Sequence, residues 1–227
     1  MTLALIFALV ILLTGCGGGS DGASQAQPPE PVSVDIFADS IARSPGLPVS
    51  LVQSLQAARP GWTVQDHSAT GLDLDALVVG YREPWPGAPA DAFPLGPQPR
   101  FADVRRQGRV VVLGLGVNDA LEMRTPKRFE ADLRQVIQVI QAEGRLPVLT
   151  GLVDLPVADL FTLERIERRR QLDAVTRAVA AELGLQHAGW GQDYRGPTDV
   201  RDNVHRTQEA SDRLALLLVA AIERACP

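Results

Sequence analysis

A carboxylate and an imidazole stand three residues apart near the C-terminus, in the segment Asp202-Asn203-Val204-His205. The chain has only three histidines, so this spacing distinguishes one of them. A neighbouring carboxylate can orient an imidazole and stabilise its protonated form, which a general base acting on a hydroxyl nucleophile requires. An ion pair on an exposed loop would give the same pattern. The segment therefore indicates catalysis only if a nucleophile and further polar groups lie with it.

The pair precedes a predicted helix. Apolar residues recur at helical spacing over residues 207–224, with Thr207 as N-cap and Glu209 in the first turn. Asp202 and His205 are therefore expected in the loop that enters the last helix.

Elsewhere, short apolar runs alternate with helical patterns. Strands alternating with helices of this length predict a parallel sheet with helices on both faces, and ligands bind such sheets at the carboxyl ends of the strands. The strands are expected at residues 32–37, 62–65, 109–115, 146–152 and 185–188, and the helices at 47–58, from Thr125-Pro126 to Gly144, and at 162–183.

Polar residues and glycines follow these strands in the loops. Ser40 comes after the first strand, Gly71 after the second and Asn118 after the third. With Asp202 and His205 in the last loop, we expect four separated segments to converge on one rim of the sheet.

In this order the segments resemble the GDSL or SGNH hydrolase family of esterases and lipases. Phe37-Ala38-Asp39-Ser40-Ile41 is similar to the first block, in which Gly-Asp-Ser follows strand one. Gly71 matches the second-block glycine. Gly116-Val117-Asn118-Asp119 has the Gly-x-Asn-Asp pattern of the third block, and residues 202–205 have the Asp-x-x-His pattern of the fifth. Each pattern alone is weak, so their joint order and strand context carry the resemblance.

The resemblance implies a fold, an activity and a set of site residues. The fold would be a flavodoxin-like α/β/α arrangement of three layers with about five parallel strands. The activity would be that of a serine esterase working through an acyl-enzyme, with Ser40 as nucleophile, His205 as base and Asp202 orienting the imidazole. The backbone amides of Ser40 and Gly71 and the side chain of Asn118 would form the oxyanion hole. No cofactor or metal is implied.

Two residues depart from the family pattern. Ala38 stands in place of the first glycine of Gly-Asp-Ser, which is harmless only if this residue keeps a negative φ. Arg206 stands where the family often has proline after the histidine. Both changes leave every reacting atom in place, so they bear on efficiency rather than on the class of reaction.

The N-terminal residues predict export. Residues 3–13 are apolar, too short to span a bilayer but long enough for the core of a signal peptide. They lead into Leu13-Thr14-Gly15-Cys16, which resembles the lipobox of bacterial lipoproteins, although residues 1–15 contain no Lys or Arg. We expect residues 1–15 to be a signal peptide and Cys16 to be lipidated.

The residues after Cys16 predict a tether and a destination. Residues 16–31 are rich in Gly, Ser, Gln and Pro and read as a flexible tether, followed by a hydrolase domain over 32–227. Gly17 in place of Asp after the cysteine resembles lipoproteins sorted to the outer membrane, here facing the periplasm. With Cys16 lipidated, Cys226 has no partner for an internal disulfide.

Composition excludes one class of partner. The net charge of -5 is mild, and the single lysine, Lys127, belongs to no basic run, so nothing indicates nucleic acid binding. The lipid anchor is the only predicted membrane contact. Oligomeric state is not predicted.

Three other features of the sequence lie outside these motifs. Gly18-Gly19-Ser20-Asp21-Gly22 matches the Gly-x-Ser-x-Gly pattern, but no strand precedes it and no helix follows it, so it belongs to the tether. His67 and His187 have no acidic or cysteine partner at metal-ligand spacing, which favours a loop or surface role over a metal site. The proline-rich residues 81–99 are expected either to wall the active rim or to form a rigid surface loop.

Several substrates and activities fit the predicted site. The substrate is expected to be a short acyl ester, an O-acetyl group on a cell-envelope or plant polysaccharide, or a lysophospholipid. The alternatives to an esterase are an acyltransferase using the same triad and a non-catalytic envelope lipoprotein that keeps the fold.

Overall fold

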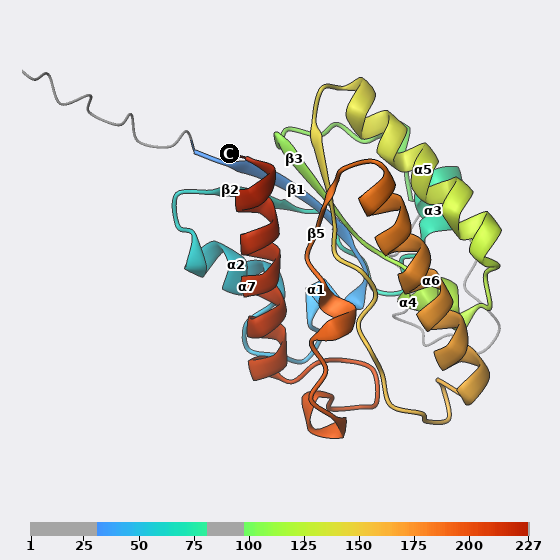
Figure 1. Cartoon of the computed structure of the whole chain (residues 1–227). Helices are drawn as coiled ribbons and strands as arrows, with labels where there is room; N and C mark the ends of the chain where they lie inside the picture. Colours follow the sequence, from blue (N-terminus) through green and yellow to red (C-terminus); the bar gives the residue numbers. More distant parts are fainter. Residues whose placement is uncertain (1–30, 81–97, 227) are drawn as a thin grey trace, which may run out of the picture. The chain divides into compact units, whose positions relative to one another are not determined.

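The computed structural model describes residues 31–80 and 98–226 (Figure 1). The predicted signal peptide, Cys16 and nearly all of the predicted tether lie outside the described residues, as do residues 81–97 of the proline-rich stretch.

The strands of the described chain form one five-stranded sheet in which neighbouring strands are parallel, in the order β2-β1-β3-β4-β5. This is the flavodoxin-like order of a doubly wound sheet, so the predicted sheet is confirmed. The strands are β1 (Ser33–Ala38), β2 (Thr63–Asp66), β3 (Val110–Gly114), β4 (Leu146–Leu149) and β5 (Gln186–His187).

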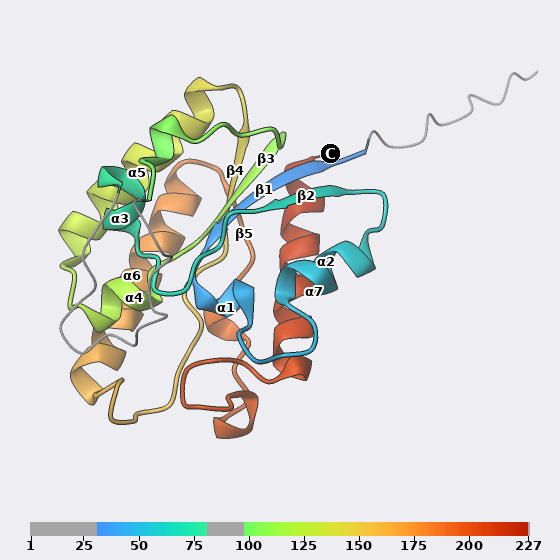
Figure 2. The same cartoon turned by 180° about the vertical axis from the view of Figure 1, so that it is seen from behind.

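Helices cover both faces of this sheet and make the two outer layers of a three-layer α/β/α fold. The two opposite views agree that α1, α2 and α7 lie on one face and α3, α4, α5 and α6 on the other (Figures 1 and 2). Their bounds are α1 (Ser40–Arg43), α2 (Leu51–Ala58), α3 (Leu74–Val79), α4 (Val117–Leu121), α5 (Pro126–Ala142), α6 (Leu163–Glu182) and α7 (Gln208–Ala225). Short 3-10 helices lie at Phe101–Asp103, Trp190–Gln192 and Pro197–Asp199.

The central strand β3 explains how the core is divided. Its side chains alternate, so Val110 and Val112 pack in the cluster beneath α2 and α7, while Val111 packs with α3, α5 and α6. All three valines are fully buried. Burying such a side chain contributes about 1.5–3 kcal/mol, which is why a strand covered on both faces reads as a continuous apolar run.

Capping residues decide where the helices begin. The Thr125 side chain accepts from the Arg128 amide, with Pro126 at the first helical position, as the sequence predicts. The predicted start of the helix at residue 47 is wrong. Ser50 and Gln53 form a capping box that starts α2 at Leu51.

Three helices and one strand end also differ from the sequence prediction. The short helices α1, α3 and α4 were not predicted, because each is too short to show a helical period. Strand β4 ends at Leu149 rather than at residue 152, where Gly151 turns the chain with φ of 77°. Within the described ranges, no helix is both long and apolar enough to cross a membrane.

Candidate active site

Ser40 lies at the carboxyl end of β1, as the first residue of α1. It was expected in a loop. Instead, Asp39 acts as an N-cap whose Oδ1 accepts a hydrogen bond of 2.8 Å from the Ile41 amide and starts the helix directly after the strand. The Asp39 amide donates to the Gly114 carbonyl of β3 at 3.3 Å. These contacts hold the Ser40 hydroxyl at the rim of the sheet, with 7% of the residue exposed.

Three side chains predicted for the site form one hydrogen-bonded chain. The Ser40 hydroxyl lies 2.9 Å from Nε2 of His205, and Nδ1 of His205 lies 2.8 Å from Oδ2 of Asp202. Because the ionised carboxylate can only accept, Nδ1 carries the hydrogen, which leaves Nε2 free to accept the serine proton. The arrangement is that of a nucleophile, a base and an orienting acid.

A tight turn holds Asp202 against the imidazole. Its other oxygen, Oδ1, accepts from the amides of Val204 at 3.1 Å and His205 at 2.7 Å. Between them Asn203 has a φ of 66°, a left-handed conformation that asparagine tolerates better than most residues. Burial raises the pKa of Asp202, but the hydrogen bonds from the His205 side chain and from the two amides outweigh it and lower the pKa overall. Asp202 is therefore ionised at neutral pH.

Arg201 ties this turn to the segment that follows α1. Its amide donates to the His205 carbonyl at 2.9 Å and its Nε to the Arg206 carbonyl at 3.2 Å. Its guanidinium also donates to the Pro45 carbonyl. One side chain thus links the loop of the imidazole with the segment that follows the helix of the nucleophile, a role that the sequence analysis missed.

Arg206 anchors the turn from its other side. The residue is 2% exposed, and its Nη2 donates to the Asp154 carbonyl at 2.7 Å. The guanidinium lies 5.3 Å from the ring centre of Tyr194, and burial lowers its pKa. The residue that stands in place of the family's proline therefore packs inside the protein.

Two hydrogen bonds bring the other predicted loops to the nucleophile. The Ala69 amide donates to the Ala38 carbonyl at 3.0 Å, which joins the loop after β2 to the end of β1. The Asn118 side chain donates from Nδ2 to the Leu72 carbonyl at 2.9 Å. Asn118 was expected in a loop and lies instead in the first turn of α4, where it is 8% exposed.

These loops carry donors suited to an oxyanion. The amides of Ser40 and Gly71 donate no hydrogen bond to another residue of the described ranges. Gly71 has a φ of 78°, which favours glycine at this turn. Asn118 uses one amide hydrogen on Leu72 and has a second one to offer.

Two carboxyl groups next to the predicted site residues, those of Asp39 and Asp119, are buried. Asp119 is 1% exposed, accepts from the Leu74 amide at 3.1 Å and lies 3.8 Å from Arg124. Burial raises its pKa to about 7 against the lowering effects of these two partners. Burial likewise raises the pKa of Asp39 to about 7.

Ala38, which stands in place of the first glycine of Gly-Asp-Ser, has the negative φ that an alanine requires there. The non-glycine residues with positive φ in the described ranges are Ser44, Met123 and Asn203, so Ala38 keeps a negative φ. Its methyl group faces Gly114, its register partner on β3, where a Cβ would lie 3.0 Å from that methyl. The glycine of β3 therefore makes room for the alanine of β1.

The remaining histidines have structural partners. Nε2 of His67 lies 2.8 Å from Oδ1 of the buried Asp35, and its ring stacks on Phe37. Nδ1 of His187, in β5, accepts from the Gly189 amide at 3.0 Å. In the part of the chain that the structure describes, no group of three or more His, Cys, Asp or Glu is placed to hold a metal ion.

The chain is similar to known esterases and lipases in sequence pattern and in fold. A family model, the GDSL-like Lipase/Acylhydrolase family, matches residues 16–213. A search of curated proteins finds no match. The chain therefore belongs to the GDSL-like lipase/acylhydrolase family, whose members share the SGNH fold.

Solved structures with similar folds include three esterases or lipases. One is a member of the lipolytic G-D-S-L family from Veillonella parvula, with a TM-score of 0.63 and 15% identity over 85% of this chain and 98% of that one. Another is the lipase/acylhydrolase from Enterococcus faecalis, with a TM-score of 0.62 and 19% identity over 85% and 96%. A third is an acetyl xylan esterase, with a TM-score of 0.63 and 18% identity over 84% and 100%. At these identities the likeness concerns the fold.

Proposed function

We propose that the protein is a serine esterase that cleaves acyl esters through a covalent acyl-enzyme. The observation that carries the proposal is the continuous hydrogen-bonded chain from Ser40 through His205 to Asp202. Two general features support it: the chain's membership of an acylhydrolase family, and the amides of Ser40 and Gly71, which donate no hydrogen bond within the described ranges.

The geometry supports a two-step reaction. His205 Nε2 takes the proton of Ser40 as Oγ attacks the ester carbonyl, and Asp202 stabilises the imidazolium that forms. The amides of Ser40 and Gly71, with Asn118 Nδ2, receive the negative oxygen of the tetrahedral intermediate. When the carbon–oxygen bond to the alcohol breaks, His205 gives its proton to the leaving oxygen. A water molecule, activated by the same imidazole, then releases the acid and restores Ser40.

Active-site labelling tests this proposal. A fluorophosphonate probe should attach to Ser40, and peptide mass spectrometry should find the adduct there. Ser40→Ala should take up no probe and lose ester hydrolysis, whereas Ser211→Ala, a buried serine on α7, should keep both. A protein that takes up no probe and cleaves no ester would be the non-catalytic lipoprotein, and ester formation with an added alcohol in place of hydrolysis would indicate an acyltransferase.

Three classes of ester are proposed as substrates. Short acyl esters, O-acetyl groups on glycans and lysophospholipids all present the ester carbonyl that this mechanism needs. The acetyl xylan esterase among the similar folds supports the inclusion of O-acetyl groups. A turnover screen of acyl esters of graded length and of acetylated glycans decides between them.

The cellular location is proposed from the sequence. The lipobox-like Leu13-Thr14-Gly15-Cys16 supports a diacylated Cys16 after removal of residues 1–15, with the hydrolase domain held by a tether at the outer membrane and facing the periplasm. Mass spectrometry of protein from the native host should find lipid on Cys16, and Cys16→Ser should be released or left unprocessed. An intact, unmodified Cys16 would disprove the anchor.

A further inference from the structure

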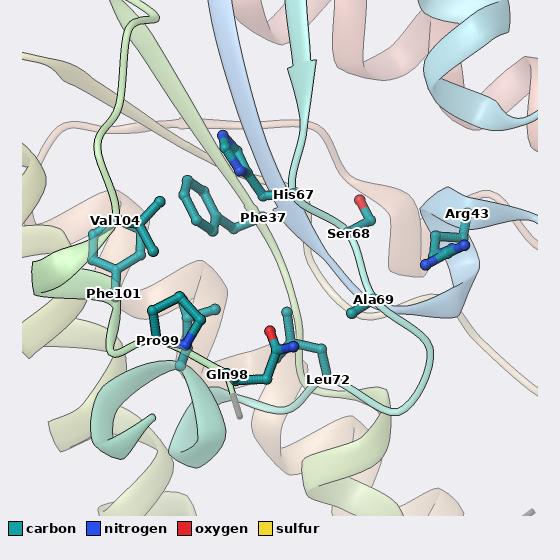
Figure 3. A pocket seen from close by; sticks show the side chains of 11 residues that line it. Phe37, Arg43, His67, Ser68, Ala69, Leu72, Gln98, Pro99, Phe101 and Val104 are labelled. Carbon is teal, nitrogen blue, oxygen red and sulfur yellow. The ribbon is translucent and has the colours of Figure 1, made fainter. Parts of the chain in front are cut away.

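A cavity of about 270 Å³ is lined by residues of β1, of α1 and of the loop that follows β2 (Figure 3). Ala69 and Leu72, which flank the Gly71 turn, form part of its wall, and Arg43 contributes from α1. The cavity therefore touches both the helix that begins at Ser40 and the loop with the Gly71 amide. It is smaller than the roughly 300–1,000 Å³ of pockets for drug-sized ligands, so it suits a short chain or a small head group.

One wall of the cavity is apolar. Phe37, Phe101 and Val104 lie together on the side across from Arg43 (Figure 3). Phe37 and Phe101 are almost fully buried and pack edge to face, with ring centres 4.7 Å apart. This wall offers contact to methylene groups.

The opposite side carries the positive charge of Arg43. The guanidinium of Arg43 makes no hydrogen bond or ion pair with any residue of ranges 31–80 and 98–226, and the residue is exposed. Arg43 stands three residues after Ser40 in the same helix, so the two side chains lie on neighbouring positions of one helix face. A positive charge thus stands within one helical turn of the reacting hydroxyl.

The described lining contains no acid to neutralise that charge. Its other polar members are His67, Ser68 and Gln98. The nearby carboxylates are engaged elsewhere: Asp35 accepts from His67 and from the amides of Gln107 and Gly108, and Asp66 accepts from the Ser68 amide. Gln98, whose carboxamide also faces the cavity, belongs to the proline-rich stretch that was expected either to wall the rim or to form a surface loop (Figure 3).

We propose that Arg43 and this cavity form a subsite for an oxyanion carried by the substrate, so that the protein prefers esters with a carboxylate or phosphate a few bonds from the scissile carbonyl. The inference rests on the proposed esterase function and narrows its substrate class. The apolar wall would take the connecting methylenes, while the guanidinium, with five donors, would bind the anionic oxygens.

Matched pairs of esters test the proposal and distinguish the sources of the anion. An acyl-side carboxylate is tested with mono-4-nitrophenyl adipate against 4-nitrophenyl hexanoate. An alcohol-side carboxylate is tested with 4-acetoxybutanoate against butyl acetate, and an alcohol-side phosphate with 2-acetoxyethyl phosphate against 2-methoxyethyl acetate. The quantity measured is the ratio of kcat/KM for the anionic member to that for the neutral member.

In at least one pair, kcat/KM for the anionic ester should be about tenfold or more higher than for the neutral ester, because a charge-assisted hydrogen bond contributes about 1.5–3 kcal/mol. Arg43→Gln should bring that ratio close to one, and Arg43→Lys should keep part of it. Arg109→Gln is the matched control, since it removes the same charge at the start of β3, at the opposite end of the strands, and should leave the ratio unchanged. Thermal melting of each variant verifies folding.

Two failures are distinguishable. In the first, the wild type cleaves the neutral esters and Ser40→Ala does not, so the protein is an esterase. If no pair then favours the anionic ester, or if Arg43→Gln keeps the preference, the proposed subsite is wrong. If no ester of any pair is cleaved, the proposed function fails and this inference fails with it.

Discussion

The hydroxyl of Ser40 lies 2.9 Å from Nε2 of His205, although the two residues are 165 positions apart in the sequence. Ser40 is held by the end of β1, whereas His205 stands in the turn before α7. The distance therefore depends on how the sheet rim and the last loop pack together.

The first prediction concerns pH. Protonated His205 cannot take the Ser40 proton, so activity should fall on acidification. Since the pKa of Asp202 is lowered, this carboxylate stays ionised below its ordinary range, so its own protonation should not contribute to the fall near neutral pH. Asp202→Asn removes the charge that favours the imidazolium, so the midpoint should move to lower pH and kcat should fall, by up to about ten-thousandfold. A pH–rate profile of both proteins with a nitrophenyl ester measures this, and an unmoved midpoint would contradict the role of Asp202.

The second prediction concerns the oxyanion. Asn118→Ala should lower kcat by on the order of a hundredfold or more with little change in KM, because the donor acts on charge that develops in the transition state. It also removes the bond to the Leu72 carbonyl, which costs about 1 kcal/mol of folding free energy. Steady-state kinetics and urea unfolding separate the two effects. Retained turnover in a folded Asn118→Ala protein would remove Asn118 from the site.

The third prediction concerns the turn between the acid and the base. Asn203→Gly should retain most activity, because glycine adopts the positive φ found there without strain. Asn203→Ala should lower the free energy of unfolding by about 1 kcal/mol and lower kcat, since the strain shifts Asp202 relative to His205. Parallel kinetics of the two variants test this. Equal activities would show that the left-handed conformation has no bearing on the reaction.

The fourth prediction concerns the anchor beside the base. Arg206→Met fills similar space without the donor to the Asp154 carbonyl, so the turn should loosen and kcat should fall by about tenfold or more, with a smaller change in KM. Arg206→Lys should recover part of the rate. If Arg206→Pro, which restores the residue the family often has, matched the wild type in kcat and in thermal stability, the buried arginine would have no role in positioning His205.

The fifth prediction concerns stability. Burial raises the pKa of Asp39 to about 7, so the folded state holds this proton until near pH 7, whereas the unfolded chain loses it near its ordinary value of about 3.9. Ionisation between these two pH values favours the unfolded state, so the contribution of Asp39 to the free energy of unfolding falls as pH rises from about 4 to about 7, by a few kcal/mol at most. Asn can still cap α1 but cannot ionise.

Urea unfolding at several pH values between 4 and 8 measures this effect. The free energy of unfolding of Asp39→Asn relative to the wild type should increase with pH up to about 7 and then level off. Asp119→Asn should behave in the same direction, because burial raises that pKa as well. A difference that is constant across the range would show that these carboxyls are already ionised in the folded protein.

The sequence by itself determined the features written within a few neighbouring residues. Three consecutive valines predict β3, Thr125-Pro126 predicts the start of α5, and Thr207 predicts the N-cap of α7, and all three are confirmed. Periodicity and capping act over one or two helical turns, so they can be read without knowledge of the fold. The order of the strands and helices likewise predicts that the loops with Ser40 and Asn118 reach the same rim.

Tertiary structure alone decided the contacts between distant segments. Ala38 is accommodated because its register partner is Gly114, and nothing in the local sequence indicates that pairing. Arg201 bonds to Pro45, and Arg206 is buried against Asp154, although an arginine in a polar loop is ordinarily read as a solvated charge. Such contacts join residues tens of positions apart, so their energies depend on how whole elements pack and not on any short pattern in the chain.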